Sequence, residues 1–188
     1  MKIILASQSQ FRKHALDILG LEYETVPSNF DESTIRHDDP YALAKALAEA
    51  KAMVIGGEHA NSVIIAADLF VVCAGQIYEK PKDEAQAVEM LKSLSGKSFE
   101  TITGLAVYNS KTEKMLSTTE ACTVKFRELS DFEITDYVKR FPVLKCAAAF
   151  EGDGMLRFAE HIQGCYTFKA GIPVNKLIEF LRENDVKV

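Results

Sequence analysis

A surplus of positive charge is absent from this sequence. Its 188 residues include 22 Lys and Arg against 27 Asp and Glu, which gives a formal net charge of −5. Proteins that bind the nucleic-acid backbone carry an excess of Lys and Arg, because these side chains neutralise phosphates. The charge balance therefore argues against a nucleic-acid partner, whereas a small anionic ligand would need only local positive charge.

Patterns of Cys and His that are typical of zinc sites are also absent. The four Cys residues form no C-x-x-C pair, and the four His residues form no H-x-x-x-H or H-E-x-x-H pattern. Protein zinc sites are usually built from such closely spaced pairs. The sequence therefore gives no support for a zinc site.

Long apolar runs are absent too. Residues 1–10 hold too few apolar residues for the central region of a signal peptide, and no stretch approaches the roughly 20 apolar residues that span a bilayer. We expect a cytoplasmic protein that has no membrane partner and whose thiols are reduced.

Linkers rich in Pro, Gly or Ser, internal repeats and low-complexity tracts are missing as well. Apolar residues make up 47% of the chain and charged residues 26%, which is typical of a soluble globular protein. The length is sufficient for one sizeable core. We therefore expect a single α/β domain over residues 1–188.

Helix caps and apolar periodicity predict a mixed order of strands and helices. Asp39-Pro40 starts an Ala-rich helix that would end at Gly56-Gly57, and Ser130 with Glu133 forms a capping box. The predicted strands cover residues 2–6, 63–72, 76–78, 99–108 and 115–126, and the predicted helices cover about 9–19, 40–56, 83–94, 130–140 and the segment from 173 onward.

Asp68 interrupts the apolar run from Val63 to Val72, which predicts a strand buried on both faces. A carboxylate inside such a strand needs a cation, a metal ion or several donors, or its pKa rises until it is neutral. Lys80 follows a short hairpin after this strand. An acid and a base at the two ends of one hairpin indicate a catalytic site. A structural Asp that bonds a neighbouring loop is the alternative.

Three other segments carry groups suited to a polyanion. In residues 6–13 a strand ends at Ser7 and runs into a helix that carries Arg12, an arrangement that suits a phosphate, although Ser residues at a helix start also act as caps. The acidic pair that ends in Glu32 could bind a metal or lie in a solvated loop. Lys51, in the Ala-rich helix, could face a ligand or solvent.

Together these segments resemble the Maf family of nucleoside triphosphate pyrophosphatases over nearly the whole chain. Each motif is short, but their order and spacing agree along the sequence. The motifs are Leu5 to Ser9 followed by Arg12, Asp31-Glu32, Lys51, Ala67-Asp68, Lys80-Pro81, Leu94 to Lys97, Thr103-Gly104, Val124 to Phe126, Tyr137-Val138 and Gly171 to Pro173.

The resemblance implies a mixed, elongated sheet flanked by helices, with two lobes around a central cleft, usually in a homodimer. It also implies a hydrolase that converts a nucleoside triphosphate to the monophosphate and pyrophosphate with Mg²⁺, Mn²⁺ or Co²⁺. Asp68 matches the proton acceptor and, with Glu32, the metal-binding carboxylates; Lys80 and Glu32 complete the catalytic set. The positions that match triphosphate contacts are Ser7, Arg12, Lys51 and Lys80.

Three departures from the commonest family pattern fall at positions that the family uses to choose a base. Phe11 replaces an Arg, Leu69 replaces a Thr, and Asp153 replaces a Gln. A branch that hydrolyses 7-methyl-GTP carries an aromatic residue at the first position and an acid at the third. The methylated guanine is cationic, so an aromatic ring can attract it by about 0.5–2 kcal/mol, and Asp153 can accept its N–H groups. We therefore predict 7-methyl-GTP as the substrate.

Other interpretations stay open from sequence alone. Phe11 could be a core residue on the buried stripe of its helix with Ala15 and Leu19, and Asp153 could be a turn residue between two glycines. A house-cleaning pyrophosphatase for dTTP, UTP or CTP, which Leu69 would permit, is one alternative function. A catalytically weak nucleotide-binding regulator of cell division is another.

Overall fold

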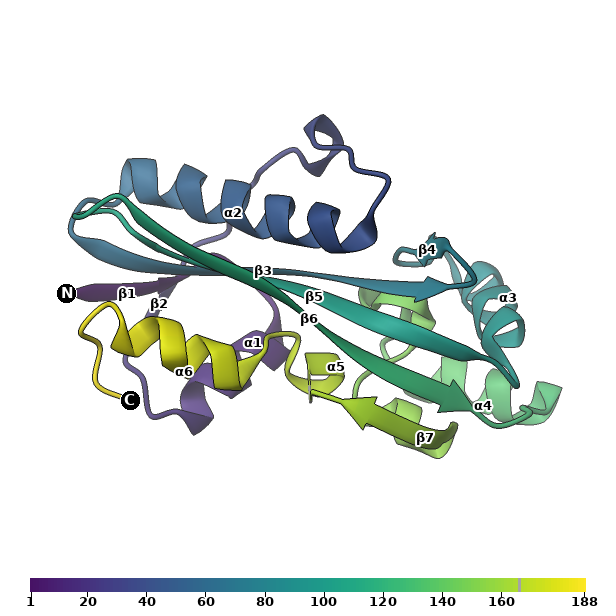
Figure 1. The fold of residues 1–188 in the computed structure, drawn as a ribbon. Coiled ribbons are helices and arrows are strands. Elements are labelled where there is room, and N and C mark those ends of the chain that lie inside the picture. Colours follow the sequence, from purple (N-terminus) through teal and green to yellow (C-terminus); the bar gives the residue numbers. More distant parts are fainter. Residues whose placement is uncertain (166) are drawn as a thin grey trace. The chain divides into compact units, whose positions relative to one another are not determined.

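The computed structural model describes residues 1–165 and 167–188, and within them the strands form one mixed sheet (Figure 1). The sheet order is β2 (Glu24–Thr25), β1 (Lys2–Leu5), β3 (Ser62–Cys73), β5 (Ser98–Asn109), β6 (Lys114–Phe126) and β7 (Ala159–Gly164), with β4 (Gln76–Tyr78) paired to β3. Strand β1 runs parallel to β2 and β3, whereas β4 and β7 are antiparallel to their partners. The predicted α/β class with a mixed sheet is confirmed.

The helices agree with the predicted segments to within one or two residues at most ends. They are α1 (Gln10–Ile18), α2 (Pro40–Glu58), α3 (Glu84–Leu94), α4 (Asp131–Arg140), α5 (Thr167–Ala170) and α6 (Val174–Arg182), and short 3-10 helices cover Glu32–Thr34, Val143–Lys145, Ala147–Ala149 and Gly154–Arg157. The sequence did not predict β7, α5 or the 3-10 helices, because each is short and weakly periodic. Within the described ranges, no helix has the length and apolar character needed to cross a membrane.

Side-chain caps fix the predicted starts of α2 and α4. The Asp39 carboxylate accepts hydrogen bonds from the backbone N–H groups of Tyr41 and Ala42 at the start of α2. Ser130 and Glu133 form the complete capping box of α4. These local bonds explain why the starts could be predicted without knowledge of the tertiary structure.

The predicted end of α2 at Gly56-Gly57 is wrong, since the helix continues through both glycines to Glu58. A side chain at Gly56 would overlap the ring of Tyr108. Gly56 therefore allows a close approach of α2 to β5 instead of ending the helix.

The chain divides into two compact units. Unit 1 comprises Met1–Asp68, Thr103–Glu120 and Ala170–Val188, and unit 2 comprises Leu69–Ile102 and Ala121–Lys169. In unit 2 a cluster of aromatic rings forms part of the core, with the Phe99 and Phe126 centroids 4.7 Å apart in an edge-to-face arrangement.

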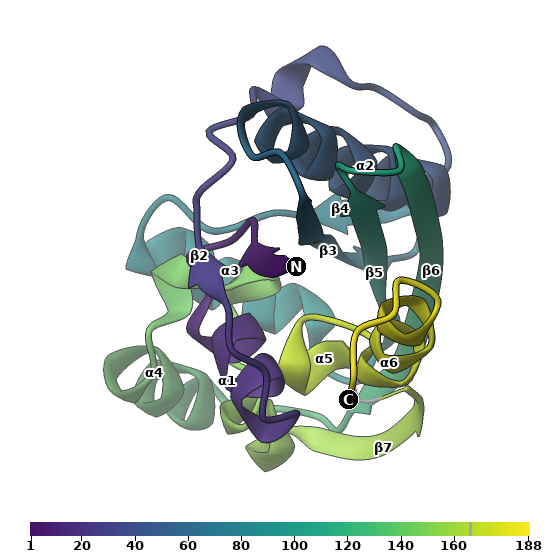
Figure 2. The same ribbon diagram turned by 90° about the vertical axis from the view of Figure 1, so that its left-hand side faces the viewer.

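In unit 1, helix α2 lies on one side of β1 and β3, and α1 and α6 lie on the other (Figures 1 and 2). Successive β3 residues alternate between these sides, because side chains of a strand point to opposite faces. Val63, Ile65 and Ala67 belong to the core cluster that includes α1 and α6 residues, and Ile64 and Ala66 belong to the cluster that includes α2 residues. The alternation therefore directs Asp68 toward α2.

Gly104 on β5 holds α2 close to the sheet. A side chain there would overlap the backbone carbonyl of Ala44 and the amide of Lys45. We predict that Gly104→Ala lowers the free energy of unfolding by about 1–3 kcal/mol, since the helix backbone would have to move. Urea unfolding measures this change.

Gly57→Ala is the matched control, because Gly57 lies in α2 with open space around it. It should stabilise the protein by about 0.5–1 kcal/mol. Equal unfolding midpoints for Gly104→Ala and the wild type would show that α2 does not pack this closely.

Candidate active site

One ammonium group joins two carboxylates in unit 1. The Lys51 Nζ lies 2.5 Å from Asp68 Oδ1 and 2.8 Å from Glu32 Oε1. Lys51 and Asp68 are each only 8% exposed, whereas the Glu32 side chain is 54% exposed. A buried acid and a solvent-accessible acid therefore share a single cation.

Helix α2 buries Lys51 because of its small residues. Ala44, Ala48 and Ala52 are buried on the helix face that includes Lys51, and their size leaves room for its long stem. Lys45, by contrast, pairs at the surface with Glu49, which lies four residues further along the helix. Of the two orientations that the sequence left open for Lys51, the structure has the inward one.

A 3-10 turn places Glu32. The Asp31 carboxylate accepts the backbone N–H of Ser33 at 3.0 Å, and the Thr34 hydroxyl donates to the Asp31 carbonyl at 2.7 Å. Hydrogen bonds from the side chain and the backbone of Ser33 lower the pKa of Asp31. Asp31 therefore shapes the turn, and Glu32 is the member of the acidic pair that reaches Lys51.

Ser7 and Arg12 form a second group of donors in unit 1. The Arg12 guanidinium donates from Nη1 to Ser7 Oγ at 3.2 Å and from Nε to the Gly171 carbonyl at 2.9 Å. Ser7 Oγ also accepts the backbone N–H of Ser9. Its oxygen is thus an acceptor twice, and its own proton can be donated to a ligand.

Gly171 is the site residue whose role sequence reasoning missed. Its φ of +63° is a left-handed conformation that glycine adopts without strain, and it directs the carbonyl to Arg12. The motif Gly171 to Pro173 was visible in the sequence. Its contact with α1 was not, because the two segments are far apart along the chain.

The electrostatics of Asp68 suit a proton acceptor. Burial raises its pKa above the ordinary value of 3.8, and the charges of Lys51 and Arg12 oppose this rise. Among the residues that the structure describes, no hydrogen-bond partner reaches the buried Asp68 Oδ2. This oxygen can therefore accept a proton, a water or a metal ion.

Burial lowers the pKa of the Arg12 guanidinium, while the nearby carboxylates of Asp68 and Glu32 oppose that shift. Arginine remains charged at neutral pH despite such shifts. The segment around β1 and α1 therefore brings a fixed positive charge into the electrostatic field of the two acids.

The residues predicted to choose the base have different surroundings. Phe11 on α1 is 37% exposed and lies outside the core clusters, so the core interpretation of its ring fails. Asp153 precedes the 3-10 helix Gly154–Arg157 and pairs with Lys169 at 2.8 Å. Leu69 packs against the core of unit 2.

Lys80 belongs to unit 2, where it follows β4 and is exposed. Its charge opposes the rise that burial causes in the pKa of the Cys146 thiol. The ammonium of Lys80 is therefore accessible to an anionic ligand.

The donor set fits a divalent metal ion that a ligand helps to coordinate. In the described part of the chain, no group of three or more His, Cys, Asp or Glu residues is placed to hold a metal. Mg²⁺ is commonly bound by one or two carboxylates together with substrate phosphates and water. Glu32 and Asp68 supply two carboxylates near one point, and Asp68 Oδ2 is unpartnered.

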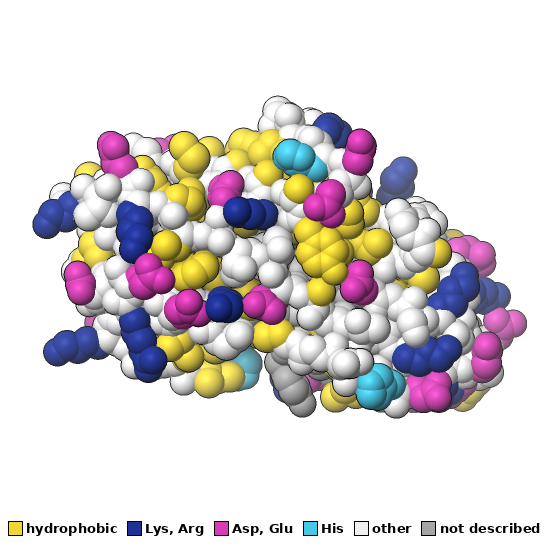
Figure 3. All heavy atoms as spheres, viewed as in Figure 1, with side chains coloured by type: hydrophobic (Ala, Val, Ile, Leu, Met, Phe, Trp, Pro, Cys, Tyr) yellow, Lys and Arg dark blue, Asp and Glu magenta, His cyan; other side chains and the backbone are white. Residues whose placement is uncertain are grey.

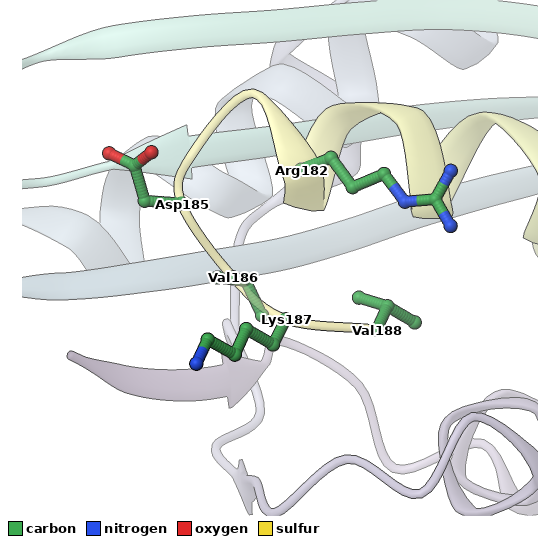
Figure 4. A pocket seen from close by; sticks show the side chains of 5 residues that line it. All are labelled: Arg182, Asp185, Val186, Lys187 and Val188. Atoms are coloured by element: carbon green, nitrogen blue, oxygen red, sulfur yellow. The ribbon is translucent and has the colours of Figure 1, made fainter.

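One surface hollow in unit 1 does not include these residues. A hollow of about 520 Å³ is lined by Arg182 and residues 185–188 (Figure 4). On the face shown in Figure 3, basic and acidic side chains are interspersed with apolar ones. The hollow contains none of the groups of the candidate site.

Relatives of known family match the chain almost from end to end. Residues 2–184 match the family model described as Maf-like protein. The dTTP/UTP pyrophosphatase of Aquifex aeolicus is 40% identical over 184 residues, covering 97% of this chain and 95% of the relative. Those of Clostridium perfringens (strain SM101 / Type A) and Geobacter sulfurreducens are 36% and 38% identical, covering 100% and 96% of this chain and 100% and 95% of the relatives.

Two solved structures share the fold at low sequence identity. The Ham1 protein of Staphylococcus aureus has a TM-score of 0.51 at 14% identity, covering 98% of this chain and all of that chain. The Ham1 protein of Coxiella burnetii has a TM-score of 0.54 at 15% identity, covering 97% and 99%. They support the mixed α/β architecture.

The sequence match and the shared fold define an enzyme of the nucleotide pyrophosphatase class, which hydrolyses acid anhydrides. The chain belongs to the Maf family. The similar relatives named above are dTTP/UTP pyrophosphatases and not 7-methyl-GTP pyrophosphatases.

The raised pKa of Asp68 predicts how pH affects stability. A carboxyl whose pKa is higher in the folded state stabilises the fold below its unfolded pKa, and this contribution is lost as pH rises through the folded pKa. Asp68→Asn resembles the neutral form. We predict that its free energy of unfolding, relative to the wild type, increases as the pH rises above about 4, the ordinary range of an aspartate. Urea unfolding at several pH values tests this, and a constant difference would contradict the raised pKa.

Proposed function

We propose that this enzyme hydrolyses dTTP and UTP to the nucleoside monophosphate and pyrophosphate, assisted by a divalent metal. The contact of Lys51 with both Asp68 and Glu32 carries the proposal, because it places a buried proton acceptor beside a second acid and a cation. The names of the similar relatives supply the substrate class.

Several basic groups would bind the triphosphate. Ser7 can donate its hydroxyl proton, Arg12 carries a fixed charge beside it, and Lys51 has an ammonium proton beyond the two that face the carboxylates. Lys80 belongs to unit 2, and its contact with the triphosphate stays a prediction from the family motif. Such charges stabilise the negative charge that phosphoryl transfer spreads over the phosphate oxygens.

Asp68 would act as the general base. A water oxygen bonds to the α-phosphorus, the bond from that phosphorus to the bridging oxygen breaks, and pyrophosphate leaves. The water proton passes to Asp68 Oδ2, which is buried and has no hydrogen-bond partner among the described residues. A base whose pKa lies nearer to neutrality accepts a proton more effectively than an ordinary carboxylate.

Glu32 and Asp68 would hold the metal, with Mg²⁺, Mn²⁺ or Co²⁺ as candidates. The bound ion would neutralise phosphate charge and lower the pKa of a coordinated water. Glu32 suits this position because its exposed carboxylate is held toward Lys51 by the turn that Asp31 shapes.

A second candidate substrate is 7-methyl-GTP. The specific observation in its favour is Phe11, whose ring is partly exposed on α1 and so accessible to a base. Asp153, although paired with Lys169, is also exposed enough to accept hydrogen bonds from a ligand.

The single domain over residues 1–188, the homodimer and the cytoplasmic location stay predictions.

We predict that Asp68→Asn lowers kcat for UTP by about 100- to 10,000-fold, since it removes the base without adding bulk. Pyrophosphate release measures kcat, and calorimetry with a non-hydrolysable UTP analogue measures binding, which should persist. Lys45→Met on α2 is the control and should keep wild-type turnover. Normal turnover by Asp68→Asn would exclude Asp68 as the base.

We predict that kcat/KM for UTP and dTTP exceeds that for 7-methyl-GTP by about tenfold or more, a difference of about 1.4 kcal/mol in transition-state stabilisation. A panel of natural and methylated triphosphates with Mg²⁺, Mn²⁺ and Co²⁺ measures these ratios. A panel in which no triphosphate releases pyrophosphate would favour the nucleotide-binding regulator.

If the panel instead favours 7-methyl-GTP, Phe11→Ala decides whether the ring is the reason. Loss of a cation–π contact worth about 0.5–2 kcal/mol would reduce the preference for 7-methyl-GTP over GTP by roughly 2- to 30-fold. An unchanged preference would show that Phe11 does not contact the base.

A further inference from the structure

Lys51 makes the kind of contacts that a metal ion would make at the same place. Its Nζ lies within 2.8 Å of one oxygen from Glu32 and one from Asp68. Because both oxygens approach a single nitrogen, they are close enough for one cation to bridge them. A divalent ion bound there would have to share these oxygens with the ammonium or displace it.

The buried acid makes that competition strong. Asp68 is 8% exposed, and its Oδ2 has no hydrogen-bond partner in the part of the chain that the structure describes. Lys51 forms an ion pair with this carboxylate, which water scarcely reaches. At such a site the interaction of opposite charges is weakly screened, so Asp68 stays ionised after the ammonium leaves only if another cation replaces it.

The lysine can leave while the helix stays. Its backbone is fixed in α2 by the buried residues around it, but the ammonium is carried on a flexible four-carbon stem. In the proposed reaction the triphosphate offers it a denser negative charge than the two carboxylates. The same ammonium can thus pair with the acids or with phosphate oxygens.

We propose that Lys51 is an internal cation that competes with the divalent metal for Glu32 and Asp68, and that triphosphate binding relieves this competition by drawing the ammonium to the phosphates. The inference rests on the proposed metal-assisted hydrolysis. Metal and triphosphate then strengthen each other's binding, because coupling between two ligands is reciprocal. Lys51 thereby favours loading of the metal together with the substrate.

The first test measures Mn²⁺ binding to the full chain without nucleotide, by electron paramagnetic resonance of free Mn²⁺. Lys51→Met and Lys51→Gln remove the competing charge and should each tighten Mn²⁺ binding by about tenfold or more, which corresponds to about 1.4 kcal/mol. Glu32→Gln should weaken it. Lys45→Met removes a charge from the same helix at the surface and should leave it unchanged.

Unchanged or weaker Mn²⁺ binding by both folded Lys51 variants would overturn the inference.

The second test needs no variant, so it holds even if these substitutions prevent folding. The wild-type protein is treated with acetic anhydride, and acetylation of Lys51 and Lys45 is followed by peptide mass spectrometry. Mg²⁺ is added at a concentration that displaces bound Mn²⁺.

If the metal displaces the ammonium from the carboxylates, Mg²⁺ should raise the acetylation rate of Lys51 several-fold and leave that of Lys45 unchanged. A Lys51 rate that stays the same or falls would contradict the inference. Neither assay contains a nucleotide. Triphosphate hydrolysis without competition at Lys51 would therefore overturn only this inference, whereas competition without hydrolysis would overturn only the proposed function.

Discussion

The contact between the ammonium of Lys51 and the carboxylate of Asp68 is the interaction on which the site depends. Both side chains are buried, so each would cost several kcal/mol without the other. The pair persists because Ala residues of α2 leave room for the lysine stem and because Gly104 lets that helix lie close to β5. The packing of small residues in unit 1 thus determines where charge can be buried, and the buried charge determines what chemistry the site can perform.

Much of this fold could be predicted because its signals are local. The start of α2 at Asp39 and Pro40 and the capping box of Ser130 and Glu133 involve residues within a few positions of one another. The strand around Asp68 is long and apolar enough to be recognised without its partners. Where the signal was local but ambiguous, as at Gly56, the prediction failed. That glycine serves a contact with Tyr108 from a distant part of the sequence.

The candidate site was predictable in part for the same reason. Asp68 stood out as a charge within an apolar run, but nothing near Lys51 in the sequence distinguishes its inward orientation from an outward one. The hydrogen bond from Arg12 to the Gly171 carbonyl joins segments at opposite ends of the chain.

The nucleotide base that the enzyme prefers was harder to predict than the position of the site residues. A plausible physical case for 7-methyl-GTP rests on Phe11 and Asp153, yet the similar relatives are dTTP/UTP pyrophosphatases. A single side chain can show that a base of a given charge would be attracted. Which nucleotide the enzyme prefers depends on all the residues that surround the base.

The central claim is that Lys51 and Asp68 form a direct, buried hydrogen-bonded ion pair in the protein in solution. The most direct measurement is the scalar coupling across that hydrogen bond, between the Lys51 ¹⁵Nζ and the Asp68 ¹³Cγ, by NMR spectroscopy of protein labelled at lysine and aspartate. We expect a resolved coupling and slow exchange of the Lys51 ammonium protons with water. An absent coupling, with Lys51 exchanging as fast as the surface residue Lys45, would contradict the claim.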